Sequence, residues 1–176
     1  MFPQLRFVDC DFHCSDIFPD IDSAVSFIEC RFHNDWVVHN VKSAHDSNVL
    51  FIECEFNKRV IINGENLWSG GIYGFTAIFQ DCQIVDLQIL SATLETAVFI
   101  DTVIGVRGIQ RVIIRDSEIR SKFSLANLKD NKNITLISST FKKKFALIAC
   151  RIDALEIVDT NFLGMVDFFE SKFESF

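Results

Sequence analysis

The residues with the most evident capacity for chemistry are six cysteines, two of which lie in nearly identical hexapeptides, FIECRF at 27–32 and FIECEF at 51–56. A thiol can act as a nucleophile, as a metal ligand or as half of a disulfide. The first two roles need the thiolate, which forms in exposed and electropositive settings. The flanking phenylalanines favour burial instead, and cysteine is among the most frequently buried residue types.

Five of the six cysteines occupy one position of a recurring pattern, and in other copies serine or threonine takes that position, as at Thr102, Ser117 and Ser139. This interchange indicates that a small side chain is required there, because several copies of one nucleophile would have no purpose. We therefore expect five cysteines to fill space in the core: Cys10, Cys30, Cys54, Cys82 and Cys150.

Cys14 is the exception, because its position in the pattern predicts that it faces outward. It adjoins His13, and His33 follows twenty residues later, so the two imidazoles are expected to stack on one face. With Asp9 and Glu29 nearby, these side chains could form a divalent metal site. An ordinary polar surface is the favoured interpretation, and no metal or cofactor is expected.

Motifs of enzymes are missing from the sequence. It contains no nucleophile elbow, no Walker loop, no HExxH motif and no CxxC pair. Enzymes also need a pocket, whereas the pattern described below predicts a filled interior. We therefore expect a protein that is not an enzyme.

The pattern has a period of five residues. From Phe79 onward, every fifth residue is large and apolar, and the residues two positions before are mostly small, as at Ala77, Cys82 and Ala92. The large members are Phe79, Ile84, Ile89, Leu94, Phe99, Ile104, Ile109, Ile114 and Ile119. This period fits neither the helical 3.6 nor the strand period of 2.0. It suits a chain that turns a corner every five residues and directs one large and one small side chain inward on each side.

Four such sides close a coil of about twenty residues, which stacks on the next coil through parallel β-ladders. The sequence therefore predicts an all-β protein with one parallel β-helix domain over residues 1–176. Irregular insertions are expected near 33–50 and 57–78, and slips of the frame, for example at 119–123, predict bulges. A less regular three-sided β-helix is the alternative.

With Leu or Phe at the centre of each unit and a small residue two positions before it, the chain resembles the pentapeptide-repeat family over most of 2–32 and 75–173. The resemblance implies a right-handed quadrilateral β-helix and a bacterial protein. Division of 176 residues by twenty gives roughly eight or nine coils, and at about 4.8 Å per coil a rod about 40 Å long.

Composition agrees with a folded domain, since 49% of the residues are hydrophobic. No apolar run reaches the length of a membrane span, and the first residues do not resemble a signal peptide, so we expect a cytoplasmic protein with reduced thiols. Charge is uneven: residues 1–106 carry 15 acids and 5 bases (−10), residues 107–144 carry 10 bases and 3 acids (+7), and residues 145–176 carry 6 acids and 2 bases (−4).

Three surface features are candidates for partner binding. Apolar residues that follow the central position form a predicted stripe; they either contact a partner or are ordinary strand residues. Aromatic residues in the second gap are either anchors on a loop or are folded against the wall. Arginines of the basic band could meet phosphate or an acidic partner, although a solvated face is favoured. The candidates of the apolar stripe are Ile28, Ile52 and Ile100. The aromatic candidates are Trp68 and Tyr73, and those of the basic band are Arg107, Arg111 and Arg115.

The function that we expect is a non-catalytic protein–protein interaction or scaffold role for the outer faces of the solenoid. The alternative is an acidic DNA mimic that binds a type II topoisomerase such as gyrase, a role that the family resemblance implies. Direct binding of nucleic acid is not expected. Neither terminal segment has the polar character of a solenoid cap, so we expect an end coil to be covered by a second copy, giving a homodimer, or by a segment outside this sequence.

Overall fold

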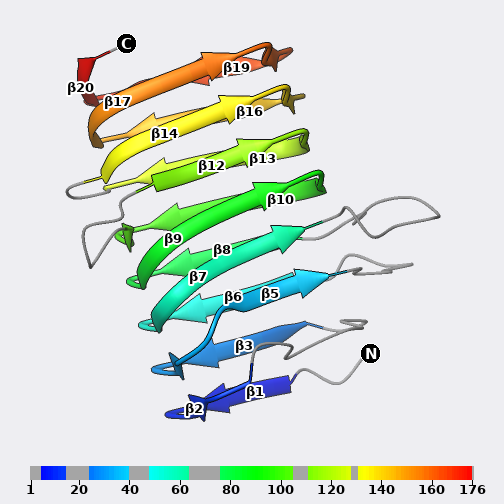
Figure 1. Cartoon of the computed structure of the whole chain (residues 1–176), viewed down its shortest axis with the longest axis vertical. Coiled ribbons are helices and arrows are strands. Elements are labelled where there is room, and N and C mark those ends of the chain that lie inside the picture. Colours follow the sequence, from blue (N-terminus) through cyan, green and yellow to red (C-terminus); the bar gives the residue numbers. More distant parts are fainter. Residues whose placement is uncertain are drawn as a thin grey trace.

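A computed structural model describes residues 5–14, 24–39, 48–63, 76–104, 111–127 and 131–175. Within these ranges the chain is all-β, with twenty strands and no helix. The strands are parallel and stack as a solenoid, with the N-terminal and C-terminal strands at opposite ends of the stack (Figure 1). The predicted parallel β-helix is confirmed.

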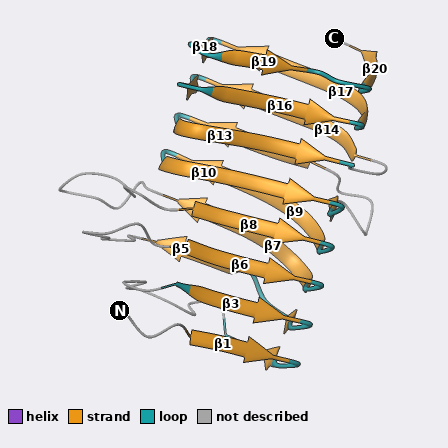
Figure 2. Ribbon diagram, turned by 180° about the vertical axis from the view of Figure 1, so that it is seen from behind, coloured by secondary structure: helices purple, strands orange, loops and turns teal. Residues whose placement is uncertain are grey.

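The strands form two ten-stranded sheets on opposite sides of the core, and the first of them is in front in Figure 2. The first sheet consists of β1 (Leu5–Val8), β3 (Val25–Ile28), β6 (Asn48–Ile52), β8 (Thr76–Gln80), β10 (Thr93–Ile100), β13 (Glu118–Ala126), β15 (Thr140–Phe141), β16 (Lys144–Ile148), β18 (Asn161–Phe162) and β19 (Met165–Asp167). The second sheet consists of β2 (Asp11–Phe12), β4 (Arg31–Phe32), β5 (Trp36–His39), β7 (Glu55–Asn63), β9 (Gln83–Leu90), β11 (Val103–Ile104), β12 (Arg111–Arg115), β14 (Asn131–Ile137), β17 (Arg151–Val158) and β20 (Lys172–Ser175).

The five-residue frame is confirmed over residues 79–99. Phe79, Ile84, Ile89, Leu94 and Phe99 have no exposed surface, so each side of the coil sends its central residue inward. The partners in neighbouring coils lie 20 residues apart for Phe79 and Phe99 but 28 apart for Phe51 and Phe79. Because some coils are longer than twenty residues, the solenoid has slightly fewer turns than the eight or nine obtained by division of the chain length by twenty.

Sharp turns with a left-handed backbone separate the two sheets. Non-glycine residues at these turns have φ between 48° and 56°, among them Asp9, Glu29, Glu53 and Asp81. The Asp9 N–H donates to the Ile28 carbonyl at 3.0 Å, and Glu29 and Glu53 make the same bond to the following coil. Each turn is therefore held by the coil above it, which offsets the cost of the unfavourable φ.

Aromatic rings form continuous columns in the N-terminal half of the core. Phe7, Phe27, Phe51, Phe79 and Phe99 stack in order, with ring centroids 4.7–5.2 Å apart. A second column, Phe12, Phe32 and Phe56, stacks at 5.0 and 4.6 Å and meets the first column edge to face. Both arrangements are favourable for aromatic pairs, and the rings pack together in the interior of these coils.

The expectation of irregular insertions near 33–50 and 57–78 stays a prediction for residues 40–47 and 64–75, which lie outside the described residues, whereas most of the described residues in these ranges form strands. Residues 36–39 form β5, and β7 runs on to Asn63 with Val60 and Ile62 buried. The five-residue spacing is interrupted in β7 by one additional residue at a corner of the coil. This residue shifts the register of β7 relative to β9 between Phe56 and Arg59. The predicted bulge near 119–123 is confirmed by a register shift between β10 and β13.

Candidate interaction faces

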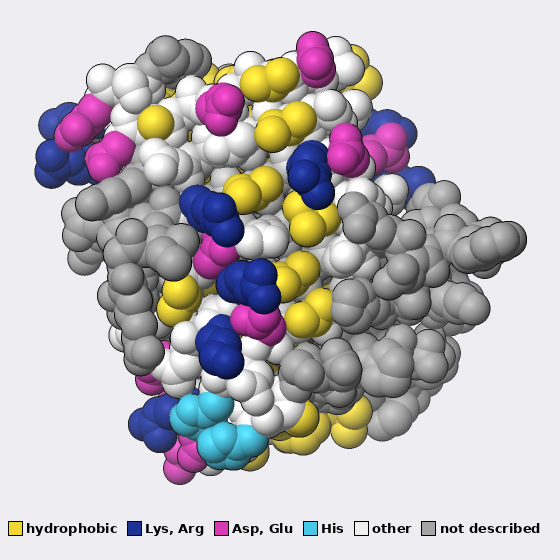
Figure 3. All heavy atoms as spheres, in the orientation of Figure 1, with side chains coloured by type: hydrophobic (Ala, Val, Ile, Leu, Met, Phe, Trp, Pro, Cys, Tyr) yellow, Lys and Arg dark blue, Asp and Glu magenta, His cyan; other side chains and the backbone are white. Residues whose placement is uncertain are grey.

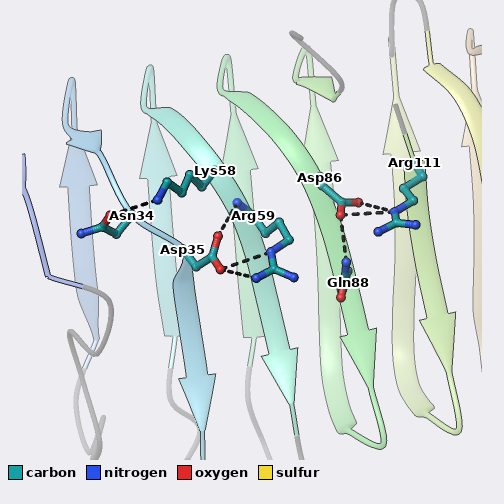
Figure 4. A network of polar contacts seen from close by, with 7 residues as sticks. All are labelled: Asn34, Asp35, Lys58, Arg59, Asp86, Gln88 and Arg111. Carbon is teal, nitrogen blue, oxygen red and sulfur yellow. Dashed lines mark hydrogen bonds and ion pairs between the residues drawn. The ribbon is translucent and has the colours of Figure 1, made fainter. Parts of the chain in front are cut away.

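One outer face of the second sheet carries a column of alternating charges, here called the charged column: Asp35, Arg59, Asp86 and Arg111 (Figure 4). Asp35 directly precedes β5 and accepts hydrogen bonds from the Arg59 backbone N–H at 3.1 Å and from Arg59 Nε at 3.2 Å. The hydrogen bond from the guanidinium holds the pKa of Asp35 below its usual value. The nearby Asp86 carboxylate in turn raises the pKa of Arg59, after the larger effect of Asp35.

Asp86 is the buried member of the charged column, with only 2% of its surface exposed. Arg111 donates from Nε to both carboxylate oxygens at 3.3 Å, and Gln88 Nε2 donates to Oδ2 at 2.8 Å. A buried carboxylate is tolerated only when it is paired and hydrogen-bonded in this way. Asp86 therefore fixes the position of Arg111 across two neighbouring coils.

Apolar side chains lie beside the charged column on the same face, which is the face turned to the viewer in Figure 3. The register places Val37 next to Ile61, and Gln88 between Ile61 and Ile113. A parallel row contains Leu90, Ile137 and Val158, with Arg115 between Leu90 and Ile137, and Val158 is 40% exposed. We call the charged column and these two rows together the mixed face.

The predicted apolar stripe lies on the first sheet. Ile28 and Ile52 are register partners and both are half-buried. Gln80 lies between Ile52 and Ile100, so the stripe is interrupted by one exposed polar side chain. The third predicted member is thus separated from the first two.

The basic band is largely paired with acids of the same chain. Arg115 Nε lies 3.5 Å from the Asp116 carboxylate, and Lys144 Nζ lies 3.3 Å from Asp167. Glu118 binds both Arg120 and Lys142, at 3.2 and 2.9 Å, and the Lys142 hydrogen bond is the main cause of its lowered pKa. Arg107, Trp68 and Tyr73, also predicted to bind a partner, lie outside the described residues.

The cysteines follow their predicted placement. Cys30, Cys54, Cys82 and Cys150 are buried, Cys10 is half-buried and Cys14 is exposed. Cys54 Sγ lies 3.5 Å from the Phe27 carbonyl and 3.3 Å from the Ile52 carbonyl. Thr102 uses its hydroxyl in the same way, with the carbonyls of Phe79 and Ile100 at 3.3 and 3.0 Å. The position therefore requires a small group that can donate to the carbonyls of its turn.

Burial makes the thiols of Cys30 and Cys82 poor nucleophiles. It is the main cause that raises the pKa of Cys30, and a hydrogen bond with the Cys54 thiol, together with burial, raises that of Cys82. A raised pKa lowers the thiolate fraction on which thiol reactivity depends.

His13 and His33 stack as predicted, with ring centroids 4.3 Å apart and planes 3° apart. Asp11 Oδ1 lies 3.0 Å from His33 Nε2, and this hydrogen bond lowers the pKa of Asp11. An imidazole nitrogen binds a metal in the plane of its ring, so two parallel rings cannot direct their lone pairs at one ion. The described residues also contain no group of three side chains suited to a metal.

Acidic side chains line the turn between the two sheets in five successive coils. This acidic corner consists of Asp9, Glu29, Glu53, Asp81 and Asp101, all with positive φ. A groove of about 430 Å³ runs along the first four of them, with Glu55 and Arg31 in its wall. Only one of these wall residues is basic, so the corner presents a continuous negative edge.

The sequence alone did not reveal the charged column. Its pairs join residues 24 and 25 positions apart, whereas the frame predicted neighbours twenty apart. No family model, curated protein or solved structure matches this chain. No helix among the described residues is long and apolar enough to cross a membrane.

Proposed function

We propose that this protein is a non-catalytic scaffold that binds a protein partner through the mixed face. The observation that carries this proposal is the placement of Val37, Ile61 and Ile113 beside a charged column whose members already bind one another. A flat face with apolar rows and fixed charges suits a protein surface, which supplies apolar area and complementary charges.

The filled core supports a binding role over catalysis. Most rings of the aromatic columns and most central residues of the coils have almost no exposed surface. The side chains that a partner could contact therefore lie on the outer faces of the solenoid. The buried thiols interact with carbonyl groups of their own turns. Recognition by outer walls is the usual mode of solenoid proteins, whose flat faces extend over several coils.

Substitutions on the mixed face test the proposal. Ile61→Lys and Ile113→Lys place a charge in the apolar row without removing a fully buried side chain, since both residues are half-buried. Gln80→Lys is the matched control, because it adds a lysine to an exposed position of β8 in the first sheet, away from the mixed face. Capture from native lysate with a photocrosslinker at Val37 is expected to yield one partner, which both isoleucine variants lose and the control keeps. Capture that is equal for all variants would overturn the proposal.

The acidic corner favours a second candidate, a DNA mimic that binds a type II topoisomerase. Its carboxylates repeat at the coil spacing, about 4.8 Å, along one edge of the rod. The internal ion pairs of Arg115, Lys142 and Lys144 reduce the positive field that would oppose such a role. In a gyrase supercoiling assay, micromolar protein should inhibit, and the variant Glu29→Gln/Glu53→Gln/Asp81→Asn should not. The absence of inhibition by the unmodified chain would exclude this candidate.

We further propose membership of the pentapeptide-repeat family, on the basis of the five-residue frame. The central residues from Phe79 to Phe99 and the small residues Cys82 and Ala92, all buried, support it. Membership implies a right-handed coil, and an experimental structure with a left-handed coil would contradict it.

A further inference from the structure

The two end coils expose side chains that every interior coil buries. Leu5 is 45% exposed, whereas Val25 and Val49 in the same column are 3% and 1% exposed. At the other end Val166 is 42% exposed, whereas its column neighbours Phe145 and Phe123 are fully buried. The outward Val8 and Phe169 are also exposed, at 48% and 60%. Within the described residues, each end therefore presents apolar surface and strands that pair on one side only: β1, β2, β19 and β20.

The end coils occupy the same two sides of the solenoid. Leu5–Phe12 reads LRFVDCDF, and Val166–Phe173 reads VDFFESKF. In both segments the fifth residue, Asp9 or Glu170, has a positive φ of 51° or 54°, so the turn lies at the same place. The central residues correspond as Phe7 with Phe168 and Phe12 with Phe173.

Charges at equivalent outward positions are opposite in the two segments. The strand registers trace one column from Arg6 through Ser26, Leu50, Ile78, Val98, Ser124 and Ala146 to Asp167. Arg6 therefore begins the column that Asp167 ends. On the second sheet, Asp11 opens β2, and Lys172 opens β20 at the other end of the sheet.

We propose that copies of this chain stack head to tail, with β1 and β2 of one copy added in parallel to β19 and β20 of the next. The stacking places Arg6 against Asp167, Asp11 against Lys172, and the Phe7 and Phe12 rings against Phe168 and Phe173. Leu5, Val8, Val166 and Phe169 then lose their exposed surface to one another. The inference is independent of the mixed face, which lies along the side of the solenoid.

The N-terminal coils already use the same rules, whereas Lys172 has the like-charged Arg151 as its register partner within the chain. Asp11, Arg31 and Glu55 are consecutive partners in one column, and their charges alternate, with Arg31 Nε 3.8 Å from Glu55. Lys172 extends this alternation by one step across the junction. Phenylalanine rings also stack on one another between neighbouring coils, as Phe7 does on Phe27 and Phe12 on Phe32.

Such an interface joins two different surfaces, so it does not close after two copies. The mean mass should therefore rise steadily with concentration. A two-fold dimer that joins two C-terminal ends would bury Phe168 and Phe169 as well, but its mass would stop at two copies and it would not involve β1 or β2. These differences separate the two modes of assembly.

Charge reversal at one pair provides the test, with sedimentation velocity of the full chain from low micromolar to several hundred micromolar protein. Lys172→Glu and Asp11→Lys each bring like charges together, and each is expected to weaken association roughly tenfold or more. An equimolar mixture of the two variants restores opposite charges at every junction. The mixture should therefore associate nearly as strongly as the unmodified chain, although neither variant does alone.

Lys58→Glu is the matched control, because it reverses an exposed charge in the middle of the solenoid and should leave association unchanged. Asp11 also contacts His33, so Arg6→Glu serves as a second variant of the same end if Asp11→Lys loses the native circular dichroism spectrum. A chain that is monomeric at every concentration, or a dimer that is insensitive to Asp11→Lys and Arg6→Glu, would overturn the proposal.

Discussion

Arg111 donates from one guanidinium nitrogen to both carboxylate oxygens of Asp86, which is buried while Arg111 is nearly half exposed. The sequence had suggested Arg111 as a contact for a partner. Its main role in the structure is to neutralise a carboxylate of the preceding coil. A partner that meets the mixed face would therefore encounter an arginine whose position is already fixed.

Removal of this arginine should destabilise the fold. In Arg111→Ala, the buried Asp86 keeps only the Gln88 donor, and the free energy of unfolding should fall by about 1–3 kcal/mol in urea denaturation. Addition of Asp86→Asn should recover part of the loss, because the remaining group is neutral. Arg115→Ala, which removes an exposed pair with Asp116, should cost less than about 0.5 kcal/mol. Equal effects at the two arginines would contradict this account.

Thiol labelling should separate the cysteines by burial. Cys14 is exposed and should react first with an aromatic disulfide reagent, while Cys30, Cys54, Cys82 and Cys150 should react only at the rate of local or global unfolding. Native-state labelling followed by mass spectrometry measures both rates. Rapid modification of Cys54 in the folded chain would show that the core is open there.

The position of Cys82 should accept serine, because Thr102 fills the equivalent place with a hydroxyl. Cys82→Ser is expected to change the free energy of unfolding by about 1 kcal/mol or less, and Cys82→Leu to cost about 1–3 kcal/mol through overpacking. Thermal or urea unfolding of the two variants provides the comparison. A serine variant as unstable as the leucine variant would refute the proposed requirement for a small donor.

Acid should weaken the contact between Asp35 and Arg59. The pKa of Asp35 is lowered from 3.8 in the folded chain, chiefly by the Arg59 hydrogen bond, so its stabilising contribution is present above the unfolded pKa. That contribution is lost as the pH falls through the lowered folded value. Unmodified protein and Asp35→Asn should therefore differ by about 0.5–1 kcal/mol near neutral pH and converge below pH 3.8. In the background Arg59→Gln, this pH-dependent difference should become much smaller, because the side-chain hydrogen bond that lowers the pKa of Asp35 most is lost.

Gly164 should be essential for the last coil. A Cβ at this position would lie 1.8 Å from the Lys143 carbonyl oxygen, which accepts the Met165 N–H at 2.7 Å. Gly164→Ala should therefore displace β19 and remove hydrogen-exchange protection from residues 161–175. Protection of residues 76–104 should remain, because their contacts are with other coils. Unchanged protection of the Met165 amide would contradict this prediction.

The sequence predicted the fold wherever one rule repeated without interruption. Phe79 to Phe99 kept the five-residue spacing, and the small inward position identified the buried cysteines. Trp36 was not recognised as a core residue, although it is 1% exposed and meets Phe51 edge to face at 5.0 Å. One additional corner residue had shifted the frame, and a period counted along the chain cannot show which corner absorbs an insertion.

The candidate site was less predictable for a related reason. Asp35, Arg59, Asp86 and Arg111 meet only because each coil adds a different number of residues between neighbours. Coil lengths depend on loops whose lengths follow no pattern, so the partners across coils become known only from strand register. Arg111 was predicted as a candidate partner contact from its charge alone, while Asp86, the residue that it binds, was overlooked.

The ladder of parallel strands also has a mechanical consequence. Every strand pairs with strands of adjacent coils, and the first and last coils lie at opposite ends of the stack (Figure 1). Tension applied between the ends would therefore peel the chain from an end, one coil after another, rather than shear all coils at once. A coil of 20 to 28 residues releases about 70–100 Å of extended chain, so the molecule would lengthen in separate steps whose sizes follow the lengths of the coils.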